Sequence, residues 1–208
     1  MFSCIGFDWD GTLFDSMEFK RENFVKIFSK CEDDKQTLLN LHYKYSGIPR
    51  KDLFNVVYKE VFGRELTDFE FKYLSQKYSE LNHESAIKSP LFPEVISVLE
   101  KIRIQRTLFI SSSMPPEELR SLVKLKKIDH YFDEILGSEP GFGKGPEHVR
   151  FISERYNKEI KDFLFVGDDD KDVELAASAR VKCLQVIRKE DLRRDNIIKS
   201  LSEILEVI

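Results

Sequence analysis

The chain alternates between short apolar runs and longer segments in which apolar residues recur at helical spacing. The apolar runs predict buried strands and lie at residues 2–7, 107–110, 135–136, 163–166 and 183–187. Helical spacing in this part of the chain occurs at residues 95–102, 146–156 and 197–207, and the prolines at 115–116 open another helix. Strands that alternate with helices predict a parallel sheet joined by right-handed crossovers.

The region between the first two predicted strands has a different pattern. From residue 16 to residue 86 the apolar spacing is helical throughout, with breaks at Gly47–Pro49 and Gly63–Arg64. A purely helical block inserted after the first strand predicts a second, smaller domain. We therefore predict an α/β core at residues 1–15 and 87–208 and a helical domain at residues 16–86.

Composition narrows the class of protein without identifying it. The chain has 208 residues, 41% of them hydrophobic, and its 33 Lys and Arg against 37 Asp and Glu give a net charge of −4. This balance excludes disordered and collagen-like chains and argues against a dedicated nucleic-acid binder. No apolar run reaches the roughly 18 residues of a membrane span, and the three scattered cysteines predict neither a disulfide framework nor a zinc site. We expect a soluble, cytoplasmic protein with no membrane or nucleic-acid partner.

Polar side chains follow three of the predicted strands. Asp8 and Asp10 come directly after the first strand, Ser111–Ser113 end the second, and Asp168 and Asp172 follow a later one. Taken singly, each cluster is typical of a turn or a helix cap. Because ligands bind outside the carboxyl ends of strands in open α/β sheets, we expect the three clusters to line one crevice.

The residue types in this crevice indicate phosphoryl transfer. Several carboxylates close together repel one another, so their ionisation requires a cation or raised pKa values. Oxygen ligands of this kind suit Mg²⁺. The hydroxyls of Ser111 and Ser112 and the ammonium of Lys144, in the glycine-rich segment 141–145, would bind phosphate oxygens. Together these groups predict a magnesium-dependent phosphoryl-transfer site.

The order and spacing of these residues resemble the haloacid dehalogenase superfamily, in its branch of phosphoglycolate phosphatases and β-phosphoglucomutase-like proteins. Residues 8–16 (Asp-Trp-Asp-Gly-Thr-Leu-Phe-Asp-Ser) are similar to its first motif, Ser111 to the second, Lys144 to the third and residues 167–172 to the fourth. The block at residues 16–86 lies where this family inserts its helical cap. The resemblance implies a Rossmann-like parallel sheet core with an inserted all-helical cap domain.

The resemblance also implies roles for the residues that match the motifs. Asp8 would be the nucleophile that attacks phosphorus and forms an aspartyl-phosphate. Asp10 would be the general acid that protonates the leaving oxygen, and then the base that activates water. Ser111, Ser112 and Lys144 would bind the phosphoryl oxygens, with Lys144 also offsetting charge in the transition state.

A metal site for Mg²⁺ is implied in the same way. The ion would be held by the carboxylates of Asp8 and Asp168 and by the backbone carbonyl of Asp10. Thr12 would lie behind these ligands and fix the motif loop, and Asp172 would either lie behind them as well or bind the metal directly.

Two regions depart from the family pattern or refine it. Trp9 resembles the phosphonoacetaldehyde hydrolase branch, but that branch has a small residue where this chain has Asp10. Residues 45–50 resemble the substrate-facing Gly-x-x-Arg loop of β-phosphoglucomutase-like members, so Arg50 would determine cap specificity by meeting a second anionic group. The alternative for Arg50 is a solvated side chain at a helix–helix turn, and Ser46 stands where the mutases have lysine.

We therefore expect a Mg²⁺-dependent phosphatase that hydrolyses the phosphate monoester of a small metabolite, as a monomer or weak dimer. A phosphosugar mutase of the β-phosphoglucomutase type is the alternative with the same chemistry. A phosphonate hydrolase and a non-catalytic phospho-receiver are further alternatives, although a receiver has no use for a helical insert after its first strand.

Overall fold

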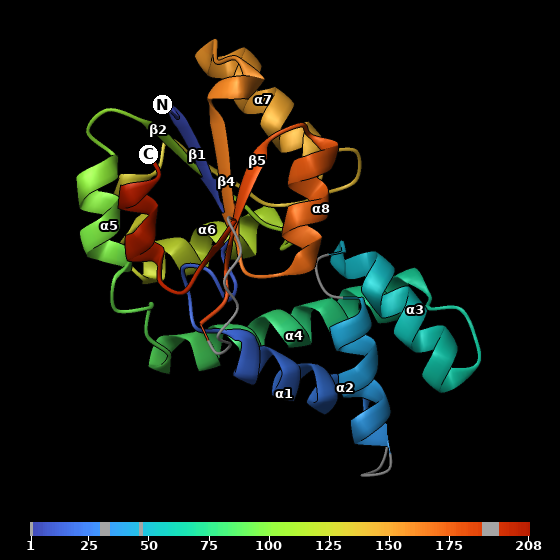
Figure 1. The fold of residues 1–208 in the computed structure, drawn as a ribbon. Helices are drawn as coiled ribbons and strands as arrows, with labels where there is room; N and C mark the ends of the chain where they lie inside the picture. Colours follow the sequence, from blue (N-terminus) through green and yellow to red (C-terminus); the bar gives the residue numbers. More distant parts are fainter. Residues whose placement is uncertain (1, 30–33, 46–47, 189–195) are drawn as a thin grey trace. The chain divides into compact units, whose positions relative to one another are not determined.

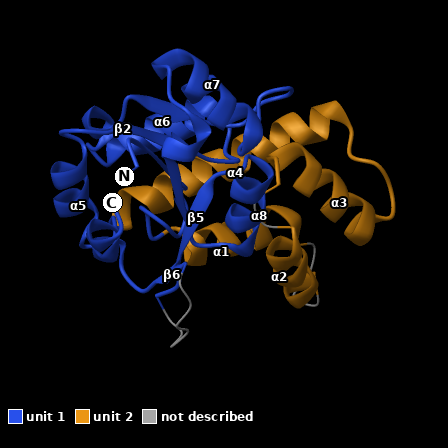
Figure 2. Cartoon of the chain, turned by 45° about the horizontal axis from the view of Figure 1, so that its top comes forward, with its two compact units in different colours: residues 1–15, 90–208 blue, residues 16–89 orange. Residues whose placement is uncertain are grey.

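The chain divides into two compact units. The computed structural model describes residues 2–29, 34–45, 48–188 and 196–208. One unit comprises Met1–Asp15 and Pro90–Ile208, and the other comprises Ser16–Ser89, as Figure 2 shows. Each unit has its own buried core. No helix in the described part of the chain is long and apolar enough to cross a membrane.

The first unit is built on a parallel six-stranded sheet (Figure 1). The strands, in chain order, are β1 (Cys4–Phe7), β2 (Thr107–Ser111), β3 (Glu134–Leu136), β4 (Phe163–Gly167), β5 (Lys182–Val186) and β6 (Ile197–Ile198). They lie side by side in the order β3-β2-β1-β4-β5-β6, and every neighbouring pair is parallel. The predicted α/β class, with a parallel sheet, is confirmed.

Helices connect the strands from β1 to β5, as is usual for crossovers in a parallel sheet. They are α5 (Val95–Ile102), α6 (Pro116–Leu125), α7 (Pro146–Tyr156) and α8 (Asp170–Ser178), with short 3₁₀ helices at Asp129–Tyr131, Ile160–Asp162 and Leu201–Glu206. Prolines occupy the first positions of α6 and α7, where the missing N–H costs no helical bond. The predicted closing helix at residues 197–207 is wrong: Ile197–Ile198 pair with β5 as an edge strand, and only a 3₁₀ helix follows.

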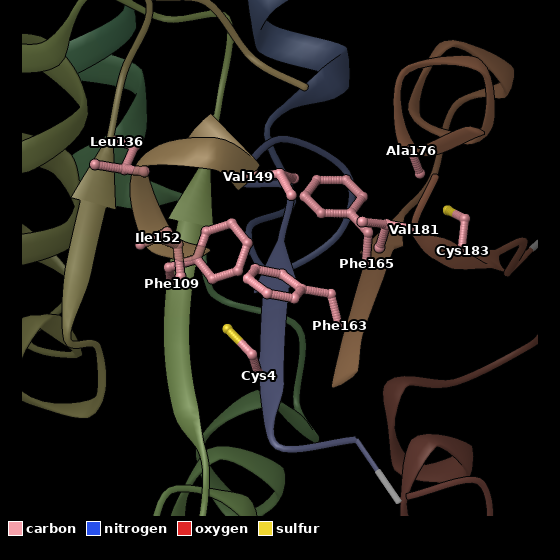
Figure 3. Packing of buried hydrophobic residues seen from close by; sticks show 10 residues of the cluster. All are labelled: Cys4, Phe109, Leu136, Val149, Ile152, Phe163, Phe165, Ala176, Val181 and Cys183. Carbon is pink, nitrogen blue, oxygen red and sulfur yellow. The ribbon is translucent and has the colours of Figure 1, made fainter. Parts of the chain in front are cut away.

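Aromatic side chains fill the core between the sheet and the helices α7 and α8 (Figure 3). Phe109 of β2 and Phe163 of β4 meet edge to face, with ring centroids 6.2 Å apart. Between these strands runs β1, where Gly6 leaves room for the Phe109 ring: a Cβ on Gly6 would lie 2.3 Å from that ring. The glycine in β1 is therefore a packing requirement of this core.

In its described residues, the second unit contains helices and the turns between them but no strand. It contains α1 (Met17–Phe28), α2 (Asp34–Lys44), α3 (Arg50–Phe62) and α4 (Asp68–Lys88). Phe24, Phe28 and Phe54 form its centre, with ring centroids 4.9 Å apart for the two pairs that include Phe28. A buried amide pair ties α1 to α4, since Asn23 Nδ2 donates to Asn82 Oδ1 at 3.1 Å. Buried polar pairs of this kind favour one register of two packed helices.

Substitution of Gly6 tests the packing of the first unit. We expect Gly6→Ala to lower the free energy of unfolding by about 1–3 kcal/mol, because the new methyl group displaces the Phe109 ring. Urea unfolding measures the loss. Gly143→Ala is the control, since its Cβ would meet no atom closer than 3.9 Å. Equal stability of the two variants would contradict this account of the core.

Candidate active site

The carboxyl ends of three neighbouring strands bring predicted site residues to one edge of the sheet. Asp8 follows β1, Ser111 is the last residue of β2, and Asp168 follows β4. Because Phe7 pairs with residues of both β2 and β4, the side chains after it begin at the same level. Lys144 reaches this edge from the loop that precedes α7. All these residues belong to the first unit.

The centre of the site is a buried ion pair between one lysine and two aspartates. Lys144 Nζ lies 2.6 Å from Asp8 Oδ1 and 2.5 Å from Asp172 Oδ1, and all three side chains are less than a tenth exposed. Burial alone would lower the pKa of Lys144, but the charges of Asp172 and Asp8 outweigh it and raise this pKa above its usual value. The ammonium is therefore charged at every physiological pH.

Negative charge exceeds positive charge in this cluster. Carboxylate oxygens of Asp8, Asp168 and Asp172 all lie within 4.8 Å of one another. Burial, followed by the charge of Asp172, raises the pKa of Asp168 to about 7. Burial also raises the pKa of Asp8, against the opposing effect of Lys144. One lysine does not neutralise three carboxylates, and an all-oxygen donor set of this kind fits a divalent cation.

Asp172 connects the lysine to the loop after β4. Its Oδ1 atom pairs with Lys144, while its Oδ2 atom accepts hydrogen bonds from the backbone N–H groups of Asp168 and Asp169, at 3.1 and 3.2 Å. The carboxylate approaches so closely that a Cβ on Gly167 would lie 2.2 Å from Asp172 Oδ2. Both oxygens of Asp172 are thus engaged in holding other parts of the site.

The loop after β1 packs directly against Asp168. Gly11 has a φ of +77°, and a Cβ there would lie 2.1 Å from Asp168 Oδ2. Thr12 Oγ1 donates to Asp168 Oδ1 at 3.4 Å. Asp10 is partly exposed, and its charge acts on both Asp8 and Asp168. The structure thus gathers the residues predicted from the first and fourth motifs.

Ser111 is held by a histidine that the sequence gives no reason to select. Ser111 Oγ lies 2.8 Å from His148 Nδ1, and His148 Nε2 lies 3.1 Å from the Gly137 carbonyl oxygen. A carbonyl only accepts, so Nε2 carries the hydrogen. Burial lowers the pKa of His148 to about 4. The ring is therefore neutral, and the Ser111 hydroxyl donates to Nδ1.

Ser112 faces its own loop. Its hydroxyl oxygen accepts from the Met114 N–H at 3.2 Å, and its carbonyl accepts from Ser138 Oγ at 2.9 Å. Ser138 Oγ in turn accepts from the Lys144 N–H at 3.0 Å. These bonds fasten the loop after β2 to the loop that carries Lys144. A phosphate-binding role for the Ser112 hydroxyl stays a prediction.

Arg50 belongs to the helical unit, where its side chain contacts α4. Its Nη1 atom donates to Ser79 Oγ at 2.7 Å, and its guanidinium lies 5.1 Å from the centre of the Tyr78 ring. The Arg50 side chain is therefore held against α4 and is not freely solvated. Ser46 and Gly47, in the loop expected to face the substrate, lie outside the described residues, and the role of Arg50 in specificity stays a prediction.

Three supporting residues were missed by the sequence analysis. His148 and Ser138 are described above, and Gln185 of β5 donates to the Asp168 carbonyl at 3.4 Å and to Asp170 Oδ1 at 3.0 Å. His148 and Gln185 contact Ser111 and Asp168, 37 and 17 positions away, and Ser138 contacts Ser112, 26 positions away. No local spacing links such pairs, although the position of Gln185 in an otherwise apolar strand is a signal that was available.

A parallel α/β core with buried carboxylates and a lysine at the ends of its strands defines an α/β enzyme with a candidate phosphoryl-transfer site. The model of the haloacid dehalogenase-like hydrolases matches residues 5–186, and the chain belongs to this family. The predicted resemblance and the prediction of a hydrolase are thereby confirmed.

Individual relatives agree with this assignment. The chain is 28% identical to a phosphoglycolate phosphatase of Mannheimia succiniciproducens and 27% identical to that of Pasteurella multocida, over 86% of this chain and 82% of each relative. A crystal structure described as a predicted phosphoglycolate phosphatase from Haemophilus somnus superimposes with a TM-score of 0.77 at 25% identity, over 99% of this chain and 97% of the other. These relatives support a phosphatase within the family.

Replacement of Asp168 tests the excess of negative charge. In chelator at pH 8, we expect Asp168→Asn to raise Tm by roughly 5 °C, because it removes a buried charge that burial and Asp172 disfavour. Added Mg²⁺ should raise Tm of the wild type and leave that of the variant unchanged. Thermal unfolding with and without the ion measures both effects. An equal rise in both proteins would place the cation elsewhere.

The neutral state of His148 predicts a pH dependence of stability. The unfolded chain binds a proton at His148 below about pH 6.5, whereas the folded chain binds it only near pH 4. More protons are bound when unfolded, so stability falls as pH falls through this window, by about 3 kcal/mol from this group. Urea unfolding of the wild type should show this loss relative to His148→Asn, which does not titrate. Parallel curves would refute a neutral, buried imidazole.

Proposed function

We propose that the protein is a Mg²⁺-dependent phosphatase that hydrolyses the phosphate monoester of a small metabolite through an aspartyl-phosphate. The observation that carries the proposal is the buried pairing of Lys144 with Asp8 beside Asp168. A purely structural ion pair between Lys144 and Asp8 would gain nothing from a third carboxylate beside it whose negative charge is not neutralised. A divalent cation held by these carboxylates would supply the positive charge that the cluster lacks and would bind the oxygens of a phosphoryl group.

Asp8 has one oxygen engaged and one available for attack. Lys144 holds Oδ1, which leaves Oδ2 as the nucleophile. A bond forms between Asp8 Oδ2 and phosphorus while the ester P–O bond breaks, and Asp10 gives its proton to the departing oxygen. Water then attacks phosphorus, Asp10 takes a proton from it, and the Asp8–phosphorus bond breaks to release phosphate and free Asp8.

The ammonium of Lys144 offsets the charge that spreads over the phosphoryl oxygens during both steps. Its pairing with Asp172 fixes the ammonium before substrate arrives, so little reorganisation is needed. Mg²⁺, held by Asp8, the Asp10 carbonyl and Asp168, would neutralise further charge and orient the phosphoryl group. The Ser111 hydroxyl, which donates to His148 Nδ1 in this structure, would bind a phosphoryl oxygen by turning its O–H toward the substrate.

The substrate that we favour is a small phosphorylated acid such as phosphoglycolate. The support for this choice is the name shared by the two curated relatives described above, at 28% and 27% identity. Arg50 of the helical unit is the residue that we propose for contact with the second anionic group. A phosphosugar mutase would share the chemistry of Asp8 and differ in the fate of the phosphoryl group.

Phosphate release from a panel of monoesters tests the proposal. We expect the wild type to turn over repeatedly with Mg²⁺ and to lose activity in chelator, and Asp8→Asn to lower kcat at least about a thousandfold because the nucleophile is gone. Asp129→Asn, a substitution at an exposed site, is the control. Interconversion of sugar phosphates without phosphate release would indicate the mutase instead. Release that survives Asp8→Asn would refute the assigned nucleophile.

A further inference from the structure

The loop after β1 carries two backbone carbonyls that its own hydrogen bonds do not use. Within the loop, the N–H groups of Leu13 and Phe14 donate to the Trp9 carbonyl at 3.1 and 3.0 Å, and the Gly11 N–H donates to the Phe14 carbonyl at 2.9 Å. The carbonyls of Gly11 and Thr12 point out of this turn. Backbone carbonyls in partly buried positions require a donor.

Arg188 supplies that donor from the far end of the chain. Its Nη1 atom donates to the Gly11 carbonyl at 3.0 Å, and its Nη2 atom donates to the Thr12 carbonyl at 3.1 Å. The residue lies two positions beyond β5, 177 residues from Gly11 in sequence. One planar guanidinium therefore holds two successive peptide groups of the first motif.

The guanidinium is itself fixed from two sides. Glu94 Oε1 accepts from Arg188 Nη2 at 3.0 Å and also from the Leu201 N–H at 3.2 Å. The Phe92 ring lies under the guanidinium, 3.6 Å from its carbon to the ring centre. Both charged side chains are about one-fifth exposed. A flat, five-donor group satisfies all these partners at once, which a lysine ammonium does not.

The loop is thus clamped between two charged residues. On one side Gly11 packs against the Asp168 carboxylate and Thr12 Oγ1 donates to it. On the other side Arg188 holds the carbonyls of the same two residues. Asp10 directly precedes them, so its place in the site depends on both contacts.

We propose that Arg188 is a positioning residue that fixes the loop at residues 9–14 and, through it, the side chain of Asp10. This role rests on the proposed function, in which Asp10 protonates the leaving oxygen. Arg188 acts on the reaction through Asp10 and does not touch the substrate. Loss of Arg188 should therefore weaken proton transfer more than phosphoryl binding.

The leaving group separates this role from a general loss of structure. An alkoxide needs a proton from Asp10 to depart, whereas p-nitrophenolate departs without one. We expect Arg188→Met to lower kcat/KM about 10- to 100-fold for the best alkyl phosphate of the panel, and less than about threefold for p-nitrophenyl phosphate. Arg188→Lys should lie between the wild type and Arg188→Met for the alkyl substrate.

Two comparisons make the assay specific to Asp10. In an Asp10→Asn background, Arg188→Met should produce no further difference between the two leaving groups, because the acid is already absent. Arg150→Met, at an exposed arginine of α7, is the matched control and should leave both values unchanged. Equal losses for the two substrates in Arg188→Met would overturn the proposal.

Amide hydrogen exchange tests the clamp independently of catalysis. We expect the N–H groups of Leu13 and Phe14 to exchange about tenfold faster in Arg188→Met and at the wild-type rate in Arg150→Met. Unchanged exchange in Arg188→Met would overturn the positioning role even in an inactive protein. If Arg188→Met exchanges faster but the wild type releases no phosphate from any monoester, the proposed function is refuted while the clamp is supported.

Discussion

The site depends on one interaction, the buried pairing of Lys144 with Asp8 and Asp172. Removing an ammonium or a carboxylate from water costs several kcal/mol, so each of these groups is tolerated only because the others are present. The pairing also joins three parts of the chain, since Asp8 follows β1, Asp172 lies in the first turn of α8 and Lys144 lies in the loop before α7. The fold brings these ends together, and the ion pair fixes their separation.

Around that pairing, two aspartate side chains approach the backbone closely. The carboxylate of Asp172 lies against Gly167 and that of Asp168 lies against Gly11, and in both cases a Cβ on the glycine would be within 2.2 Å of a carboxylate oxygen. Glycine at these two positions therefore sets the geometry of the acidic cluster. The same cluster retains more negative than positive charge, which leaves it dependent on a cation or on a proton at Asp168.

Local sequence was sufficient to predict the strands and the residues that end them, because a buried strand and the polar turn after it are formed by consecutive residues. Asp8, Ser111 and Asp168 were found in this way. His148, Ser138 and Gln185 were not, because their roles depend on hydrogen bonds to Ser111, Ser112 and Asp168, which lie 37, 26 and 17 positions away in sequence. The end of the chain was also misread: Ile197–Ile198 have helical spacing with the residues after them, yet the free edge of β5 recruits them as a strand.

Charge and preorganisation together explain why so many supporting contacts surround so few reacting groups. In the proposed reaction the attacking oxygen, the acid and the lysine must all be positioned around one phosphorus atom. Positional errors of a fraction of an ångström lower the reaction rate. Long, flexible side chains such as Lys144 meet that requirement only when a second partner holds them, and Asp172 is that partner. The position of the acid, Asp10, depends in the same way on its backbone, because Asp10 lies on a loop. A loop that must be both tightly turned and immobile needs its outward carbonyls bound, and a guanidinium anchored by Glu94 and Phe92 meets that need.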